Sequence, residues 1–437
     1  MPSGEILIIG GGLAGAEAAW QARKLGVRVT LIEMKPKRFS PAHRSTDLAE
    51  LVCSNSLRSR SLETASGLLK EEMRRLSSLI MSVAEETSVP AGSALAVDRQ
   101  EFSRSITRIL DEAGVHIVRE EVTSIPPPPQ TVAICTGPLP SEAMARALQE
   151  LTDADALYFY DAIAPIVDAD SIDAERTYWA SRYDKGGPDY LNCPMDRETY
   201  HRFVEAILGA EKAPLREFEE IPPFEGCMPV EDLAARGRET LAHGPMKPVG
   251  LIDPKTGKRS YAVVQLRRDN ASGSLLNMVG FQTKMTQREQ KRVFRMIPGL
   301  EDAHFYRYGS VHRNAFLNAP RLFLSTLQLK KEPRVFFAGQ LTGVEGYIES
   351  AATGLIVGMN AARWSKGISL SLPPATTSLG ALLRYLVEAD PEGFQPMHVN
   401  FGIFPPLPDS PRFSRKHRRQ AYAERALRDL DAWLHQG

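Results

Sequence analysis

The stretch that most constrains the fold of this chain runs from Ile6 to Met34 and reads ILIIGGGLAGAEAAWQARKLGVRVTLIEM. Its apolar beginning predicts a strand buried on both faces, and the glycine-rich turn after it predicts the start of a helix. After Gly26, a second apolar run predicts a parallel strand that ends at Glu33. Strand, glycine turn, helix and strand in this order predict a dinucleotide-binding unit of the Rossmann type.

The glycines of the motif G-x-G-x-x-G have separate physical roles. We expect Gly10 to permit the tight turn, Gly12 to let the backbone approach a pyrophosphate, and Gly15 to let helix and strand pack closely. The N-terminus of the helix would present N–H groups and a positive dipole end to the phosphates. An acid at Glu33, about 20 residues after the middle glycine, suits a ribose 2′-hydroxyl and favours FAD or NAD over NADP. The predicted cofactor contacts of this turn also include Leu13 and Ala14.

Two later segments predict that the chain returns to the same cofactor. The apolar run 131–135 predicts a strand that leads into Thr136 and Gly137. After another predicted strand at 334–338, the segment GQLTGVEGYIESAATGLIVGMNAARW predicts a glycine turn over a ligand, followed by a closely packed helix of small residues. A pure NAD domain does not need this late piece, so FAD is favoured. The late residues expected at the cofactor are Gly339, Gln340, Gly343, Val344, Gly346 and Tyr347.

The rhythm of alternating strands and helices stops beyond about Asp168, which predicts an inserted domain. The expected fold is therefore α/β, with an FAD-binding Rossmann-type (glutathione-reductase-like) domain and an inserted α+β domain. Residues 1–168 would form the first part of the FAD-binding domain, 169–305 the inserted domain on the substrate or RNA side, and 306–437 the second part with a C-terminal basic helix. Locally, helical spacing predicts one helix over 62–83, and 122–125 is a strand candidate.

Composition excludes several classes of protein. The 437 residues suffice for two or more domains, and the hydrophobic content of 43% and charged content of 24% are ordinary for a globular protein. No apolar run approaches the roughly 20 residues of a membrane helix, and the first strand begins too early for a signal peptide, so we expect a cytoplasmic protein without a membrane partner. The 53 basic and 53 acidic side chains cancel, so DNA is not expected and any polyanion needs a local basic patch.

The four cysteines, Cys53, Cys135, Cys193 and Cys227, are widely spaced and form no C-x-x-C pair. This argues against a disulfide framework and against a metal site. Cys135 falls inside a predicted strand and is interpreted as a buried structural thiol. Cys53 in LVCSNSL and Cys227 in FEGCMPVE lie in turn-like segments, where a thiol can meet a partner that lowers its pKa, although inert thiols are the alternative.

Basic side chains gather in two places. Helical spacing puts Arg288, Lys291, Arg292 and Arg295 on one side of a predicted helix, shortly after Lys284, which suits a phosphate backbone; a solvated helix face is the alternative. A second basic run, 415–419, begins the last predicted helix, where positive charge opposes the helix dipole.

Seven motifs together resemble the TrmFO family, the folate- and FAD-dependent RNA uracil-C5 methyltransferases. They are GGGLAGAEAAW, LVCSNSLRS, FEGCMPVE, VGLIDP with YAVVQLR, NMVGFQTKMT, IPGLEDAHFYRYGSVHRN and FFAGQLTGVEGYIESAATG, and they extend to about Arg363. The resemblance implies a bacterial enzyme that forms 5-methyluridine, usually in the T-loop of tRNA. It also implies 5,10-methylenetetrahydrofolate as carbon donor, reduced FAD as reductant, and NADH or NADPH to restore the reduced flavin.

The resemblance further implies roles for individual residues. Cys227 would add to uracil C6 and Cys53 would assist near the flavin, with the reverse assignment open. His312 and Arg313 would contact the folate, and the basic residues 284–295 would contact the RNA, with the run 415–419 as a further candidate beside the alternative of a solvated helix start. Ribosomal RNA stays open as a substrate. A flavin oxidoreductase acting on a small molecule and a non-catalytic RNA-binding flavoprotein are the rival functions.

Overall fold

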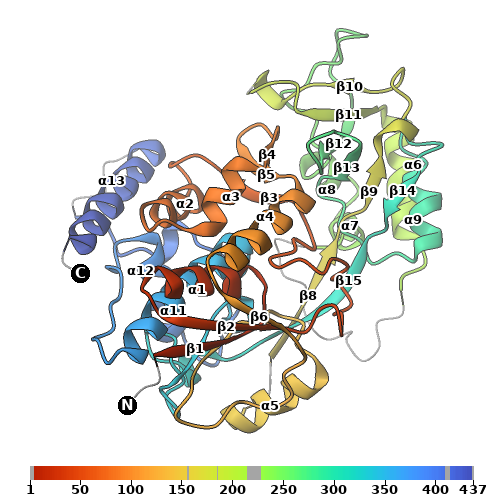
Figure 1. Ribbon diagram of the computed structural model, residues 1–437. Helices are drawn as coiled ribbons and strands as arrows, with labels where there is room; N and C mark the ends of the chain where they lie inside the picture. Colours follow the sequence, from red (N-terminus) through yellow and green to blue (C-terminus); the bar gives the residue numbers. More distant parts are fainter. Residues whose placement is uncertain (1–3, 155–156, 185, 214–227, 409–413, 436–437) are drawn as a thin grey trace.

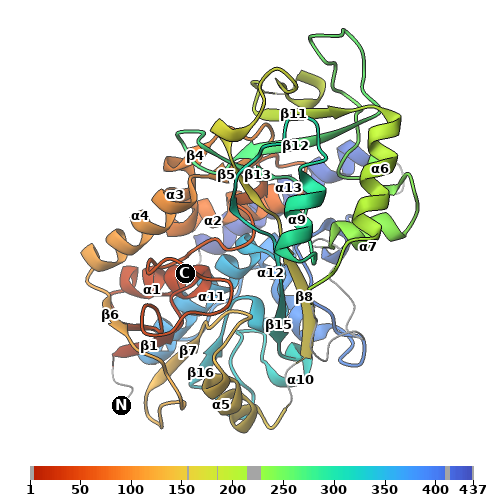
Figure 2. The same ribbon diagram turned by 90° about the vertical axis from the view of Figure 1, so that its right-hand side faces the viewer.

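The structure is a computed structural model that describes residues 4–154, 157–184, 186–213, 228–408 and 414–435 (Figures 1 and 2). Two large sheets, joined by a two-stranded ribbon, organise the chain. Within the described residues, no helix combines the length and apolar character needed to cross a membrane.

The first sheet is parallel, with five strands in the order β16-β7-β1-β2-β6. Strand β1 pairs with β2 on one side and with β7 on the other, and Ile6 lies opposite Val29 and Thr131. Their apolar side chains are buried, as expected for central parallel strands. The strands are β1 (Glu5–Ile9), β2 (Arg28–Glu33), β6 (His116–Arg119), β7 (Thr131–Ile134) and β16 (Val335–Phe337).

Helix α1 (Leu13–Lys24) follows β1 directly, and α11 (Tyr347–Ser365) packs along it (Figure 1). The contact needs glycine, because a Cβ on Gly354 or Gly358 would overlap the carbonyl oxygen of Ala14 or Ala18, respectively. The late helix of small residues therefore packs closely beneath the dinucleotide turn, as the sequence predicted. The two chain regions that were expected to share one cofactor share one layer of the fold.

The second sheet is antiparallel, with six strands in the order β10-β11-β12-β13-β9-β14, and has its own hydrophobic core. Phe203, Phe281 and Phe294 are fully buried in this core beside the helices of the same unit. The strands are β9 (Ile166–Asp168), β10 (Tyr178–Trp179), β11 (Tyr190–Met195), β12 (Ala262–Arg268), β13 (Leu275–Met278) and β14 (Phe305–Arg307), and the helices are α6 (Arg197–Leu208), α7 (Val230–Ala235), α8 (Thr240–His243) and α9 (Gln287–Phe294).

Strands β8 (Leu157–Ile163) and β15 (Ser310–Phe316) form the antiparallel ribbon that connects the two sheets (Figures 1 and 2). His312 lies opposite Asp161 in the ribbon register. The ribbon therefore carries the chain out of the parallel sheet and back, and it brings residue 312 to the region between the two sheets.

A small three-stranded sheet and three helices form a further layer, whose helices pack on α1 and α11. The single helix expected over 62–83 is wrong, because the chain breaks at Ser77, which adopts φ 54°, and Ser78 starts a new helix by accepting a hydrogen bond from the Met81 N–H. The elements are β3 (Ser56–Ser59), α2 (Ala65–Arg75), α3 (Leu79–Glu86), β4 (Ser88–Val89), β5 (Ala94–Val97) and α4 (Arg99–Glu112).

The strand expected at 122–125 does not form. The chain after β6 is irregular up to β7, and Val122 and Ile125 pack against the core instead of joining the sheet. Four prolines follow at 126–129 and have no N–H to donate to a neighbouring strand. Apolar content at this position therefore reflects packing and not strand pairing.

The C-terminal part returns to the first layer. Helix α13 (Arg415–Leu434) docks on α2, where the Arg75 guanidinium lies 2.6 Å from the Asp431 carboxylate. The remaining helices are α5 (Glu142–Thr152), α10 (Ala319–Leu322) and α12 (Ser378–Glu388), with short 3₁₀ turns at Ala169–Ser171, Arg182–Asp184, Gln340–Thr342 and Phe401–Ile403.

Candidate active site

A cavity of about 350 Å³ opens at the carboxyl ends of β1, β2, β7 and β16. Its wall combines the glycine turn after β1, the long loop after β2, the Thr-Gly turn after β7 and the late segment from Gly339 to Ser350. Ligands of open parallel sheets bind at this edge. Of the residues predicted from the sequence, the cavity is lined by Gly10, Gly12, Leu13, Ala14, Glu33, Cys53, Thr136, Gly137, His312, Gly339, Gln340, Gly346 and Tyr347.

The glycine turn has the shape that a dinucleotide requires. Gly10 adopts φ 101°, and a Cβ there would collide with the backbone at Cys135. A Cβ on Gly12 would meet nothing within 4 Å, so this glycine leaves room for a ligand beside the backbone. A Cβ on Gly15 would overlap the Gly10 carbonyl oxygen, so the third glycine serves the contact between helix and turn. Among the described residues no side chain caps α1, whose first N–H groups follow this turn.

Two polar groups at the cavity wall suit the sugar and phosphates of a dinucleotide. The Glu33 carboxylate accepts hydrogen bonds from the N–H groups of Gly11 (2.8 Å) and Lys35 (3.0 Å), which fixes its position at the end of β2. The Thr136 hydroxyl is buried and has no hydrogen-bond partner in the described part of the chain. A buried hydroxyl without a partner is costly, so a polar ligand group beside Thr136 would stabilise this wall.

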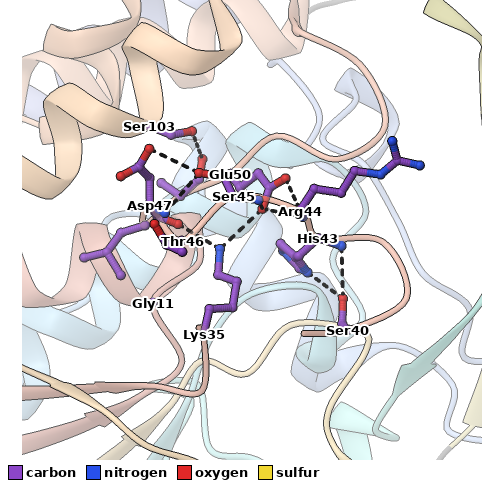
Figure 3. Close-up of polar contacts among 12 residues, drawn as sticks. Gly11, Lys35, Ser40, His43, Arg44, Ser45, Thr46, Asp47, Glu50 and Ser103 are labelled. Atoms are coloured by element: carbon purple, nitrogen blue, oxygen red, sulfur yellow. Dashed lines mark hydrogen bonds and ion pairs between the residues drawn. The ribbon is translucent and has the colours of Figure 1, made fainter. Parts of the chain in front are cut away.

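The loop after β2 is organised by one ion pair (Figure 3). The Lys35 ammonium lies 3.4 Å from the Glu50 carboxylate, with both side chains almost fully buried, and also donates to the Asp47 carbonyl oxygen at 2.7 Å. The Glu50 carboxylate accepts from the N–H groups of Arg44 (2.9 Å) and Ser45 (3.1 Å). The polar loop was expected to be functional, but its residue types did not reveal this pairing across 15 positions.

Two histidines at the cavity are held neutral. Burial, and then the positive charge of Lys35, lower the pKa of His43 to about 4. Burial, and then Arg307, lower the pKa of His312 to about 4 as well. Both imidazoles are therefore uncharged near neutral pH, which suits stacking on a flat ligand ring more than binding of an anion. His312 was a candidate from the sequence, whereas His43 was missed because no motif marks it.

The thiol of Cys53 belongs to a turn that Tyr347 organises. The Tyr347 hydroxyl oxygen accepts hydrogen bonds from the N–H groups of Cys53 (2.7 Å) and Ser54 (3.2 Å). The Cys53 Sγ lies 3.6 Å from the Ala162 carbonyl oxygen of β8. Burial, and then the charge of Cys53, raise the pKa of Tyr347, so this phenol stays protonated. The cavity thus brings a cysteine next to the residues of the dinucleotide turn.

Buried arginines fasten the same turn to the second sheet. Arg267 of β12 donates to the Ser54 hydroxyl (3.0 Å) and to the Asn55 side-chain oxygen (2.9 Å). Arg99 of α4 forms a two-point ion pair with Asp269, at 2.8 and 3.2 Å, and also donates to the Leu51 carbonyl oxygen. These residues were missed in the sequence, although an arginine within the apolar run of β12 signals a buried polar partner.

A buried carboxylate completes the cavity wall. Glu349, in the first turn of α11, is 1% exposed. Its Oε1 accepts from Arg58 (3.3 Å) and from the Val399 N–H (3.1 Å), while Oε2 has no hydrogen-bond partner among the residues described. Glu349 was not predicted as a site residue, because it lies in a run of small residues that predicts only a closely packed helix.

Several predicted cofactor residues lie away from the cavity lining. Gly343 adopts φ 88° and packs against the Phe394 ring, and Val344 is buried and bridges to Met397. Both residues shape the turn before α11 and hold it against the C-terminal segment. Like Gly15, they stabilise segments that form the cavity wall without lining the cavity themselves.

The predicted basic face is smaller than its spacing suggested. Lys284 is ion-paired with Asp232, and the Arg295 guanidinium donates to the Ala303 carbonyl oxygen (2.9 Å). Arg292 pairs with Glu289 on the surface, at 2.5 Å. Arg288 and Lys291 are exposed. Helical spacing could not show that two of these five charges are held by neighbouring segments.

The other cysteines differ from Cys53. Cys135 and Cys193 are buried, and burial raises the pKa of both thiols, to about 12 for Cys135. The prediction of a buried thiol at Cys135 is confirmed. Cys227 and the side chain of Arg313 lie outside the described residues.

Comparisons with known proteins agree with this geometry. The family model described as glucose inhibited division protein A matches residues 5–369. The methylenetetrahydrofolate–tRNA-(uracil-5-)-methyltransferase TrmFO of Geobacter sulfurreducens is 59% identical over 434 residues, which cover 99% of each chain. The protein of the same name from Desulforudis audaxviator is 57% identical over 99% of this chain and 98% of its own.

Among solved structures, GidA of Aquifex aeolicus matches with a TM-score of 0.69 at 16% identity, over 98% of this chain and 73% of that chain. This likeness confirms the predicted α/β fold with a Rossmann-type dinucleotide domain. The relatives, the family model and the glycine turn with its late partner segment lead to one conclusion: the chain belongs to the TrmFO family.

Proposed function

We propose that this protein forms 5-methyluridine in tRNA, at the T-loop uridine. The carbon donor is 5,10-methylenetetrahydrofolate, the reductant is reduced FAD, and NADH or NADPH restores the reduced flavin. The names of the relatives support the folate donor and the tRNA substrate. The observation that carries the proposal is that the Cys53 turn and the dinucleotide turn line one cavity.

The residues present fit FAD. The open space beside Gly12, the fixed Glu33 carboxylate and the unpaired Thr136 hydroxyl would hold its pyrophosphate and ribose. Gly339, Gln340, Gly346 and Tyr347 would hold it from the other end of the chain. When bound, reduced FAD would supply the hydride equivalent that converts a methylene unit into a methyl group.

A thiol is required because uracil C5 is a poor nucleophile until a thiolate adds to C6. We assign this addition to Cys227, with Cys53 assisting next to the cofactor; the exchanged assignment uses the same two residues. The Val230 N–H donates to the Gln282 carbonyl oxygen (2.7 Å), and Gln282 lines the cavity. Val230, three positions after Cys227 in the chain, is therefore held next to a residue of the cavity wall.

The remaining candidates take positions on the substrate side. The neutral ring of His312 lines the cavity and would stack on the flat pterin of the folate, with Arg313 next to it in the chain. The exposed residues Arg288 and Lys291 would contact RNA phosphates together with Arg292. Lys284 and Arg295 would stiffen that surface, because their side chains are held by Asp232 and by the Ala303 carbonyl oxygen.

The test gives the FAD-loaded protein labelled methylenetetrahydrofolate, NADPH and unmodified tRNA, with ribosomal RNA fragments in a parallel reaction. We expect label in 5-methyluridine of tRNA. Label in ribosomal RNA alone would transfer the same chemistry to the other substrate. Flavin turnover that is indifferent to RNA, without labelled RNA, would favour a small-molecule oxidoreductase, and RNA retention without label would favour a non-catalytic binding protein.

A further inference from the structure

We propose that a second hollow, next to the cavity, binds the phosphate backbone of the RNA substrate and stacks one of its bases. This inference rests on the proposed function and adds a binding site to it. The hollow lies between the N-terminus of α2, the segment 398–402 and the first turns of α13. None of the residues expected at the flavin or the folate lines it.

Positive charge dominates the hollow. Arg58, Arg418 and Arg419 line it, and no hydrogen bond or ion pair joins either of the last two guanidinium groups to another described residue. Glu63 is the carboxylate on the described wall, and the Lys416 ammonium lies 3.6 Å from it. The arrangement therefore leaves two arginines with open hydrogen-bonding groups, which is the chemistry that holds phosphate oxygens.

Helix α2 adds to this field. Its N-terminal residues Thr64, Ala65 and Ser66 line the hollow, and its first turn contains no acidic residue. The Thr64 hydroxyl accepts from the Gly67 N–H and the Thr64 N–H donates to the Ser61 carbonyl oxygen, so the N–H groups of Ala65 and Ser66 remain for a ligand. The positive end of the helix dipole and these N–H groups favour an anion at the same place as the arginines.

An aromatic pair forms another part of the wall. The rings of Phe401 and Tyr422 stack with centroids 5.4 Å apart and planes at 17°, and both side chains are half-buried. Aromatic rings beside arginines are the usual platform for a base of single-stranded RNA. A phosphate site and a stacking site thus lie within one hollow.

The hollow is continuous with the cavity at one residue. Arg58 lines both, and its ion pair with Glu349 (3.3 Å) holds it between them. It adopts φ 65°, a left-handed conformation that is uncommon outside glycine. An RNA whose uridine enters the cavity would therefore lay its neighbouring nucleotides across Arg58 into the hollow. The exposed residues Lys416 and His417 continue the basic surface along α13, which favours a polymer over a small phosphate compound.

The first experiment measures binding of fluorescently labelled, unmodified tRNA to the FAD-loaded protein by anisotropy at several salt concentrations. The double variant Arg418→Ala/Arg419→Ala should bind at least about tenfold more weakly, and its salt slope should fall by about 2, since each phosphate contact contributes about 0.9. Arg428→Ala is the matched control, because Arg428 is exposed on the same helix and lines neither space. Its affinity should stay within about twofold of the wild-type value.

A second pair of variants separates stacking from charge. Tyr422→Leu should weaken binding about fivefold or more with an unchanged salt slope, because base stacking does not release counterions. Tyr422→Phe keeps the ring and should keep the wild-type affinity. Equal loss in both variants would overturn the stacking site.

Methylation activity and the KM for NADPH, measured on the same variants, distinguish this inference from the proposed function. Wild-type methylation with unaltered tRNA affinity in the double variant would overturn the RNA site and leave the proposed function standing. Absence of 5-methyluridine in the wild-type reaction would overturn the proposed function itself. Flavin reduction by NADPH without RNA tests the other phosphate source: an unaltered KM for NADPH supports RNA, whereas a raised KM with normal tRNA affinity would assign the hollow to the dinucleotide.

Discussion

At the scale of single residues, Tyr347 does more than line a cavity. Its hydroxyl oxygen holds the N–H groups of both Cys53 and Ser54, so one side chain at the start of α11 fixes the turn that carries the thiol. Glycine-rich segments show where the backbone can approach a ligand, and these segments could be predicted from the sequence. Pairings across the fold, such as residues 53 and 347, leave no local pattern and could not be predicted.

Tyr347→Phe should destabilise the fold by about 1 kcal/mol and lower kcat, because two partly buried N–H groups lose their acceptor. FAD should stay bound, since the ring remains. Chemical unfolding and the methylation rate check this. Tyr385→Phe is the control: its hydroxyl donates to the Gln395 carbonyl oxygen (2.6 Å) away from the cavity, and kcat should not change. A wild-type kcat for Tyr347→Phe would contradict the positioning role.

The lowered pKa of His43 predicts a stability change with pH. The folded protein takes up a proton here only near pH 4, whereas the unfolded chain does so near 6.5, so the free energy of unfolding falls as the pH drops through this window. His43→Gln should show a shallower fall between pH 6.5 and pH 4. Comparing the two proteins cancels the other titrating groups, and parallel curves would contradict the assignment.

At the scale of elements, the sequence predicted the helices and strands that are marked by regular apolar spacing or by a glycine motif. The β1–α1–β2 unit and the strands predicted at 131–135 and 334–338, which form β7 and β16, agree with the structure. The break at Ser77 could not be predicted, because apolar spacing continues through it and the interruption depends on packing. The strands β10 and β14 are too short to show a pattern in the sequence, and they are strands because they pair with β11 and β9, respectively.

The contact of α1 with α11 gives an element-scale prediction. Gly354→Ala should destabilise the fold by about 1–3 kcal/mol or more and reduce FAD retention, because the added methyl group overlaps Ala14 beneath the glycine turn. Gly209→Ala is the control, since its Cβ would meet only an ordinary contact at 3.4 Å. Thermal unfolding and the flavin absorbance of the purified proteins measure both effects. Equal behaviour of the two variants would show that α11 can shift without disturbing the turn.

At the scale of the whole molecule, the site depends on how the two sheets are held together. The ion pair of Arg99 with Asp269 joins α4 to the chain just after β12, and both side chains are about nine-tenths buried. Arg267 fastens the same place to the Cys53 turn. The sheets could be anticipated separately from the sequence, but not the charges that join them, since these lie 170 positions apart.

Asp269→Ala should destabilise the protein by about 3–5 kcal/mol, because it leaves the Arg99 charge buried and unpaired. The double variant Arg99→Met/Asp269→Ala should recover part of this loss. Glu112→Ala, which breaks the exposed pair with Arg108, should cost about 0.5 kcal/mol or less. Urea unfolding curves compare the three variants. A loss of unfolding free energy for Asp269→Ala as small as that for Glu112→Ala would contradict a stabilising role of the Arg99–Asp269 ion pair.

The most direct test of a thiol-dependent methylation next to the flavin uses Cys227→Ala. The wild-type and variant proteins, both loaded with FAD, receive labelled methylenetetrahydrofolate, NADPH and unmodified tRNA, and nucleoside mass spectrometry locates the label. We predict labelled 5-methyluridine at the T-loop position with the wild type and none with the variant, while both retain FAD and Cys193→Ala remains active. Normal amounts of labelled 5-methyluridine from Cys227→Ala would contradict the account.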